Sequence, residues 1–153
     1  MTKKVAVLMG SANDAEKMAP AREILERFGV AHEVWAMSAH RNADEVKKFV
    51  GDARANGFGA IIAAAGMAAH LAGACAAHTT LPVIGVPVAG GALNGVDALY
   101  STVQMPTGMP VATVAINGAA NAAILAVEIL AVADDDLAAQ LDEYRRGWEA
   151  KQL

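Results

Sequence analysis

Short apolar runs alternate with amphipathic segments along the whole chain. Runs at residues 4–9, 59–65 and 82–86 are almost continuously apolar, as expected for parallel strands that are covered on both faces. Two further runs, at 31–37 and 111–115, bring the number of predicted strands to five. The pattern therefore predicts a sheet whose strands are separated by helices.

Between these runs, apolar residues recur every three or four positions, which predicts amphipathic helices. The first is expected over 14–28, with Gly29 ending it in a left-handed conformation. The second is expected over 42–56, with Asn42 as its N-cap. The others are expected at 68–78, 95–104, 119–133 and from 134 onward. Such alternation is typical of a doubly wound parallel sheet with right-handed crossovers, here in a single α/β domain over residues 1–153.

The composition points to an oligomer. The chain is 55% hydrophobic but only 5% aromatic, and much of the apolar content is alanine. A small domain with so high an apolar content is typical of proteins that bury apolar surface between subunits. The last predicted helix carries an apolar stripe formed by Leu137, Leu141, Tyr144 and Trp148. We expect the segment 134–153 to pack on a neighbouring subunit through this stripe.

Charge and cysteine content exclude several classes of function. The net charge is −4 and no run of lysine or arginine exceeds two residues, so we expect no nucleic-acid binding. No signal peptide is recognisable, and no stretch approaches the roughly 18 apolar residues of a membrane span. The single cysteine, Cys75, lies in an apolar run and is expected to be a buried, inert thiol in a reducing, cytoplasmic compartment.

Residues suited to chemistry follow three of the predicted strands. The first strand is followed by Ser11, Asn13 and Asp14, the second by Ser38, His40 and Arg41, and the third by Gly66, His70 and Leu71. Ligands of parallel sheets bind beyond the carboxyl ends of the strands, so these residues are expected at one edge. A turn at a helix start and an arginine suit a phosphate, and an imidazole suits proton transfer. A glycine-rich loop at 88–95 is expected at the same edge.

Each segment also has a simpler structural explanation. Ser11, Asn13 and Asp14 are all good helix caps. His40 alone is compatible with a surface loop, and His70 with a histidine bonded to backbone. Neither a dinucleotide-binding fingerprint nor a P-loop is present. We expect no metal, since no third ligand accompanies the two histidines.

Taken together, the segments resemble the class I N5-carboxyaminoimidazole ribonucleotide mutases, the PurE family of purine biosynthesis. The resemblance runs from Val5 to about Ala133. Its matching segments are 9–14, 38–41, 68–71, 81–87, 95–101 and 103–108. It implies a flavodoxin-like three-layer α/β/α sandwich, a cytoplasmic homo-octamer, a ribonucleotide substrate, and no metal or organic cofactor.

The resemblance also implies a reaction, which moves a carboxylate from the exocyclic nitrogen of the substrate to ring carbon C4. Carbon dioxide leaves the nitrogen and is then attacked by C4, and the product is 4-carboxy-5-aminoimidazole ribonucleotide. His40 would be the general acid/base, supplying a proton in the first half and removing the C4 proton in the second. His70, Leu71 and the backbone of 66–69 would line the carboxylate pocket.

The same resemblance assigns Ser11, Asp14 and Arg41 to the ribose phosphate, with Ser38 and Asn13 beside them. Asn13 stands where the family usually has serine and can still donate a hydrogen bond. Further departures from the family pattern lie at Met67, Ala72 and Ala74, where glycine, proline and methionine are frequent.

Two alternatives remain open at this point. The related class II enzymes carboxylate the free ribonucleotide with carbon dioxide. They typically have lysine at the position of Arg41 and Arg-Ser-Asn in place of 67–69, which this chain lacks. The other alternative is a nucleotide-binding module without catalytic activity.

Overall fold

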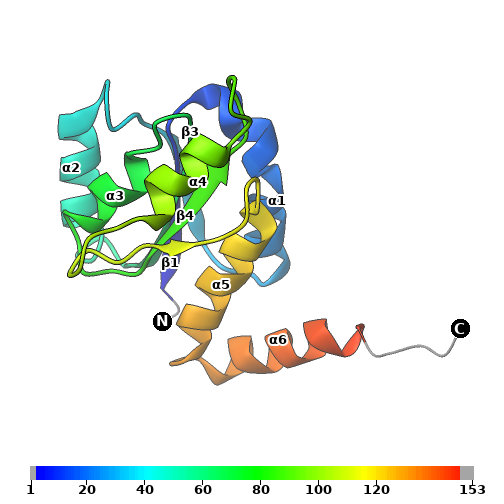
Figure 1. Cartoon of the computed structure of the whole chain (residues 1–153). Helices are drawn as coiled ribbons and strands as arrows, with labels where there is room; N and C mark the ends of the chain where they lie inside the picture. The colour runs from blue at the N-terminus through cyan, green and yellow to red at the C-terminus, as the bar shows by residue number, and fades with distance from the viewer. Residues whose placement is uncertain (1–2, 149–153) are drawn as a thin grey trace, which may run out of the picture.

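Residues 3–148, the part of the chain that the computed structural model describes, form three layers around a parallel sheet (Figure 1). The strands are β1 (Lys4–Met9), β2 (His32–Ala36), β3 (Phe58–Gly66), β4 (Val83–Val88) and β5 (Ala112–Thr113), in the order β2-β1-β3-β4-β5. The helices are η1 (Ala12–Asp14), α1 (Ala15–Arg27), α2 (Ala43–Asp52), α3 (Leu71–Ala76), α4 (Val96–Val103), α5 (Ala119–Ala131) and α6 (Asp135–Arg146). Every strand pairing is parallel, which confirms the predicted flavodoxin-like sandwich.

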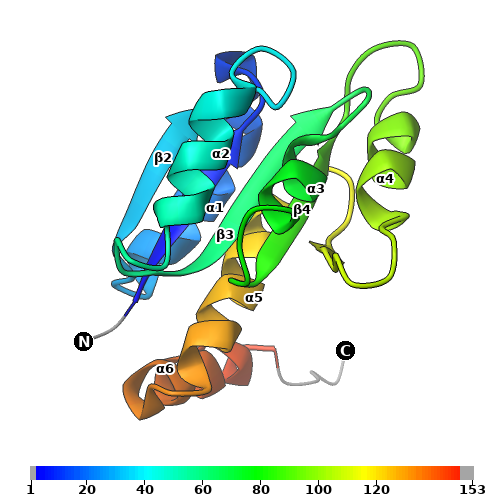
Figure 2. The ribbon, with the colours of Figure 1, turned by 90° about the vertical axis from the view of Figure 1, so that its left-hand side faces the viewer.

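Both faces of the sheet are buried, and β1 shows why its sequence is apolar throughout. Val5 and Val7 belong to the core beneath α1 and α5, whereas Ala6 and Leu8 belong to the core beneath α2 and α3. Because successive side chains of a strand point to opposite faces, both sets of positions must be apolar. Figure 2 shows α2, α3 and α4 on the face toward the viewer, with α1 and α5 behind the sheet.

Small residues allow the layers to approach closely. The alanines of α5 at positions 119, 122, 123 and 126 are fully buried, and this helix packs along α1. Gly85 in β4 has the same function on the opposite face. A Cβ atom there would collide with Thr102 of α4 and would lie 3.3 Å from the Cβ of Ala72 in α3.

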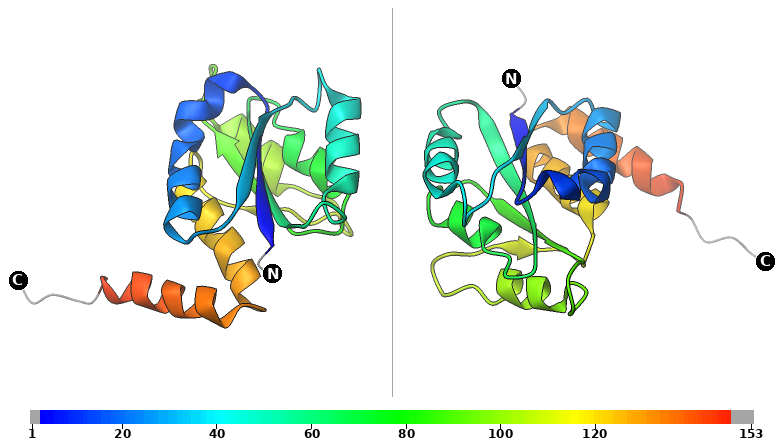
Figure 3. Two further views of the ribbon diagram at one scale, coloured as in Figure 1. Left: turned by 180° about the vertical axis from the view of Figure 1, so that it is seen from behind. Right: turned by 90° about the horizontal axis from the view of Figure 1, so that it is seen from above.

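The apolar stripe of α6 is divided between two environments. Leu137 and Leu141 are buried within the chain itself, and the ring of Tyr144 lies 5.6 Å from that of Phe28. Trp148 is 68% exposed, and α6 projects beyond the three layers (Figures 1 and 3). The first half of the stripe is therefore used internally, while packing on a neighbour stays a prediction; residues 149–153 lie outside the described part.

Three predicted elements are clearly shorter in the structure. The second helix ends at Asp52 rather than at Asn56. The third helix starts at Leu71 rather than at Ala68, because Met67 has a φ of 53° and the N–H of Ala69 donates to the carbonyl of Met67. The fifth strand keeps only Ala112 and Thr113, which pair with β4 at the edge of the sheet. For the third helix, the left-handed backbone of Met67 prevents an α-helix from starting at the next residue.

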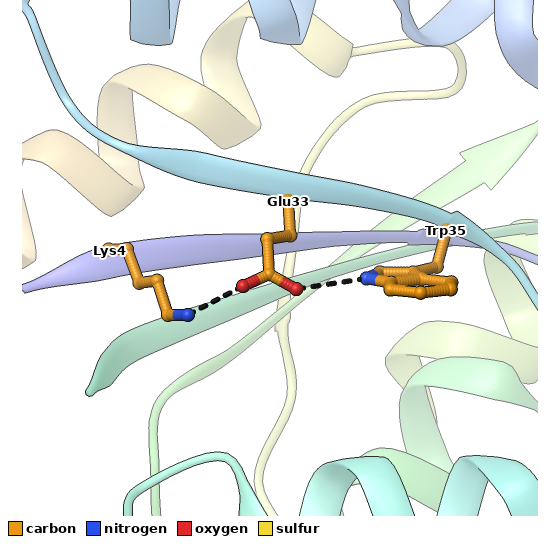
Figure 4. A network of polar contacts seen from close by, with 3 residues as sticks. All are labelled: Lys4, Glu33 and Trp35. Carbon is orange, nitrogen blue, oxygen red and sulfur yellow. Dashed lines mark hydrogen bonds and ion pairs between the residues drawn. The ribbon is translucent and has the colours of Figure 1, made fainter. Parts of the chain in front are cut away.

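Polar side chains attach the other edge strand, β2, to β1 (Figure 4). The ammonium group of Lys4 donates to Oε1 of Glu33 at 2.5 Å, and the indole N–H of Trp35 donates to Oε2 at 3.2 Å. These two hydrogen bonds, the Lys4 bond foremost, lower the pKa of Glu33. Half-exposed pairs of this kind contribute little stability but fix the side chains on the open face of β2.

Cys75 is fully buried in α3, and this burial raises the pKa of its thiol to about 12. The prediction of an inert thiol is confirmed. Within residues 3–148, no helix is both long enough and apolar enough to span a bilayer.

Candidate active site

A cavity of about 510 Å³ opens at the carboxyl ends of the strands, where the loops after β1, β2 and β4 lie together along the upper edge of Figure 1. All nine residues that the sequence singled out line it, namely Ser11, Asn13, Asp14, Ser38, His40, Arg41, Gly66, His70 and Leu71. They come from segments that are about thirty residues apart in sequence. The prediction that one edge of the sheet gathers them is confirmed.

The turn after β1 combines capping with an unusual carboxylate. Ser11 is the N-cap of η1, and its Oγ accepts from the backbone N–H of Asn13 at 3.2 Å, so the capping interpretation is correct for Ser11. Asp14 precedes α1 but, within residues 3–148, makes no capping hydrogen bond to it. Burial raises the pKa of Asp14, and nearby Lys17 partly opposes this shift. The turn therefore presents a partly desolvated carboxylate to the cavity.

Ser38 shapes the turn that carries His40 and Arg41. Its Oγ accepts from the backbone N–H groups of both residues at 3.3 Å, and its own N–H donates to Oδ1 of Asn42 at 3.2 Å. Asn42 is the N-cap residue of α2, as the sequence predicts, but its side chain makes no capping hydrogen bond and accepts from Ser38 instead. The buried Ser38 thus positions its neighbours, and its direct contact with a substrate stays a prediction.

Arg41 joins the two turns. Its Nη2 donates to the carbonyl oxygen of Gly10 at 3.0 Å, which places the guanidinium beside the turn of Ser11 and Asp14. A planar cation next to a serine hydroxyl at the start of a helix suits a phosphate group. The arrangement agrees with the phosphate site expected from the sequence.

The two histidines are in direct contact and both line the cavity. Nε2 of His40 lies 2.8 Å from Nδ1 of His70, and the rings meet edge to face at 4.7 Å between centroids. Nδ1 of His70 is also 2.8 Å from the carbonyl oxygen of Ala68. Since a carbonyl oxygen only accepts, this nitrogen bears a hydrogen in that contact and shares it with His40. Within residues 3–148, no third His, Cys, Asp or Glu completes a metal-binding group.

Gly66 ends β3 and Met67 follows it, close to His70 in the sequence. A Cβ at Gly66 would lie 3.1 Å from the carbonyl oxygen of Val88, so glycine allows β3 and β4 to approach closely here. Met67 adopts a left-handed conformation and is 62% exposed in the cavity. Leu71 is buried and begins α3, with His70 as its N-cap.

The structure adds cavity residues that the sequence did not assign to the site, chiefly Lys17 and the segment 88–91. The glycine-rich loop was predicted at this edge but was not assigned to the site. Lys17 lies one helical turn after Asp14, and that spacing was the available signal. It was weak, because exposed lysines are common on helices.

The family model described as AIR carboxylase (AIRC) matches residues 4–151, which include every segment that lines the cavity. The chain belongs to the AIR carboxylase family. It is 52% identical over 145 residues to the N5-carboxyaminoimidazole ribonucleotide mutase of Escherichia coli K12, covering 94% of this chain and 86% of that protein. It is 53% identical over 138 residues to the Aquifex aeolicus protein of the same name, covering 90% and 83%.

A solved structure agrees with this family membership. The crystal structure of Treponema denticola PurE matches with a TM-score of 0.85 at 28% sequence identity, covering 94% of this chain and 89% of that one. The two chains thus share the same overall fold over nearly their whole length.

Proposed function

We propose that this chain is an N5-carboxyaminoimidazole ribonucleotide mutase, an isomerase of purine biosynthesis that forms 4-carboxy-5-aminoimidazole ribonucleotide. Relatives about half identical over nearly the whole chain carry that name. The observation that carries the proposal is the pair of His40 and His70, in contact at 2.8 Å within a cavity that also contains a phosphate-suited turn. A proton-transfer group and a candidate anion site thus line the same cavity.

The ribose phosphate binds where Arg41 meets the turn of Ser11. The guanidinium donates to phosphate oxygens, and the hydroxyl of Ser11 and the amide of Asn13 add further donors. Asp14 accepts from a ribose hydroxyl, which compensates its carboxylate for the water it loses on burial. This orientation points the imidazole ring of the substrate toward the histidines.

The reaction needs one group that gives and takes a proton. The bond between the exocyclic nitrogen and the carboxylate carbon breaks, carbon dioxide is released, and the nitrogen keeps the electron pair and gains a proton. The enamine-like C4 then attacks carbon dioxide, and the hydrogen on C4 leaves as a proton. His40 serves both transfers. Gly66, His70 and Leu71 line the pocket that holds the carboxylate.

A substrate comparison tests this proposal against direct carboxylation. The purified protein is given either the carboxylated ribonucleotide at low bicarbonate or the free ribonucleotide with abundant bicarbonate, and the product is followed by absorbance. The proposal expects fast conversion of the first substrate. A carboxylase would use the second substrate faster, and a non-catalytic module would bind ribonucleotide without converting either.

We also propose a cytoplasmic homo-octamer, as the resemblance implies. Apolar side chains exposed on β2 and α4, including Trp35, Tyr100 and Val103, support association between copies. Light scattering is expected to give a mass about eight times 15.7 kDa, and cell fractionation is expected to recover the protein with the soluble fraction. A monomer mass at micromolar concentration would contradict the assembly.

A further inference from the structure

The residue that follows β4, Ala89, is held from both sides of its peptide backbone. Its N–H donates to Oδ1 of Asn117 at 2.9 Å, and its carbonyl oxygen accepts from Nζ of Lys17 at 2.7 Å. Asn117 is itself anchored, because its own N–H donates to the carbonyl of Pro87 at 2.8 Å. Lys17 thus ties α1 to a loop that is 72 residues away in sequence.

From this anchored residue, Gly90 and Gly91 extend along the cavity wall. Gly91 has a φ of 63°, and a Cβ on it would lie 3.5 Å from Cγ of Met67 and 3.9 Å from its sulfur. The side chain of Met67 therefore lies against Gly91. Met67 follows β3 and segment 89–91 follows β4, and these two strands pair at Gly66 and Val88. Met67 and segment 89–91 therefore line the cavity at the ends of two neighbouring strands.

The left-handed backbone of Met67 supports a role beyond filling space. A non-glycine residue at φ 53° is strained by roughly 1 kcal/mol or more, and such strain persists where the surroundings impose it. Here the strained Met67 also presents an apolar side chain to the cavity, which Gly66 and His70 line as well.

We propose that Lys17 and Met67 are positioning residues that keep segment 89–91 against the cavity and thereby retain carbon dioxide between the two halves of the reaction. This inference rests on the proposed function, because only a mutase releases and recaptures carbon dioxide within one turnover. A gap in this wall lets the small neutral molecule escape before C4 attacks it. The side chains of both residues act through the segment 89–91.

The test follows the fate of the carboxylate carbon. Unlabelled N5-carboxyaminoimidazole ribonucleotide is converted in a buffer of ¹³C-bicarbonate, and mass spectrometry measures ¹³C in the product at early conversion, against a control without enzyme. We expect little label with the parent protein, and about threefold more or higher with Lys17→Met and with Met67→Ala. Lys17→Arg restores a donor to Ala89 and is expected to restore retention. Lys47→Met, an exposed lysine of α2 outside the cavity, is the matched control.

Three results would overturn the inference. If Lys17→Met and the parent both turn over and incorporate the same amount of ¹³C, the bond from Lys17 to Ala89 is not needed to retain carbon dioxide. Loss of turnover without label in Lys17→Met shows a different role for this residue. Label at the level of the medium in the parent shows that carbon dioxide is not retained. Failure of the proposed function looks different, since the parent would then convert no carboxylated ribonucleotide.

Discussion

Nδ1 of His70 is 2.8 Å from Nε2 of His40 and 2.8 Å from the carbonyl oxygen of Ala68, so one ring nitrogen serves two partners. The hydrogen on Nδ1 points between an oxygen and a nitrogen lone pair. The contact therefore holds the two rings edge to face, with their centroids 4.7 Å apart.

We predict that His70→Leu lowers kcat by about 10- to 100-fold while KM changes little, because His40 loses the partner that orients it. His70→Asn keeps an N–H donor near the position of Nδ1 and is expected to retain an intermediate kcat. Steady-state kinetics of both variants checks this. A kcat for His70→Leu equal to that of the parent would remove His70 from the mechanism.

We predict that Arg41→Ala raises KM for the ribonucleotide by about 10- to 100-fold, the loss of one hydrogen bond to a charged group. The guanidinium is held beside the phosphate-suited turn by Gly10, so its removal acts on binding more than on proton transfer. Arg22→Ala, at an exposed arginine of α1, is the matched control. An unchanged KM in Arg41→Ala would contradict the phosphate contact.

We predict that Asp14→Asn weakens substrate binding but stabilises the unliganded fold. Burial raises the pKa of Asp14 above its ordinary value of 3.8, so ionisation in the folded state costs stability. The stability present at low pH, below the unfolded pKa, is lost as pH rises through the folded pKa. At about pH 7 the variant should therefore melt at a higher temperature, and the difference should shrink toward about pH 4.

Thermal unfolding across this pH range, together with KM at neutral pH, gives both readings for Asp14→Asn. A lower melting temperature for the variant at neutral pH would show that the carboxylate stabilises the fold.

The spacing of apolar residues predicted the strands well, because burial on both faces of the sheet leaves a strong apolar signal. It predicted element ends poorly where the conformation of a single residue determines them. The start of the third helix depends on the left-handed Met67, which the sequence gives no reason to expect from a side chain of that type. Asn42 does occupy the N-cap position of α2, but its side chain accepts from Ser38 four residues earlier rather than from the helix.

The site residues could be predicted because the strand ends could be predicted, and a parallel sheet brings the carboxyl ends of its strands to one edge. The contact of His40 with His70 was not predictable, since it depends on ring orientations in two loops. Neither was the bond from Lys17 to Ala89, which links residues far apart in sequence. Such contacts arise from the packing of loops rather than from local pattern.

We predict that Gly85→Ala destabilises the protein by about 1–3 kcal/mol, because its Cβ would collide with Thr102 and lie 2.9 Å from Cγ1 of Val111. Gly51→Ala is the matched control; it lies in α2 with nothing within 4 Å of its Cβ and should gain about 0.5–1 kcal/mol of helix propensity. Denaturant unfolding compares the two. Equal midpoints would show that the layer above β4 adjusts freely.

The most direct test of the whole account is His40→Asn, assayed on the carboxylated ribonucleotide and by calorimetric titration with the product. Asparagine keeps a polar side chain but cannot exchange a proton with C4 or with the exocyclic nitrogen. The account predicts that turnover is abolished while the dissociation constant stays within about tenfold, or about 1.4 kcal/mol, of the parent value. Turnover near that of the parent would contradict the central claim that His40 moves the proton.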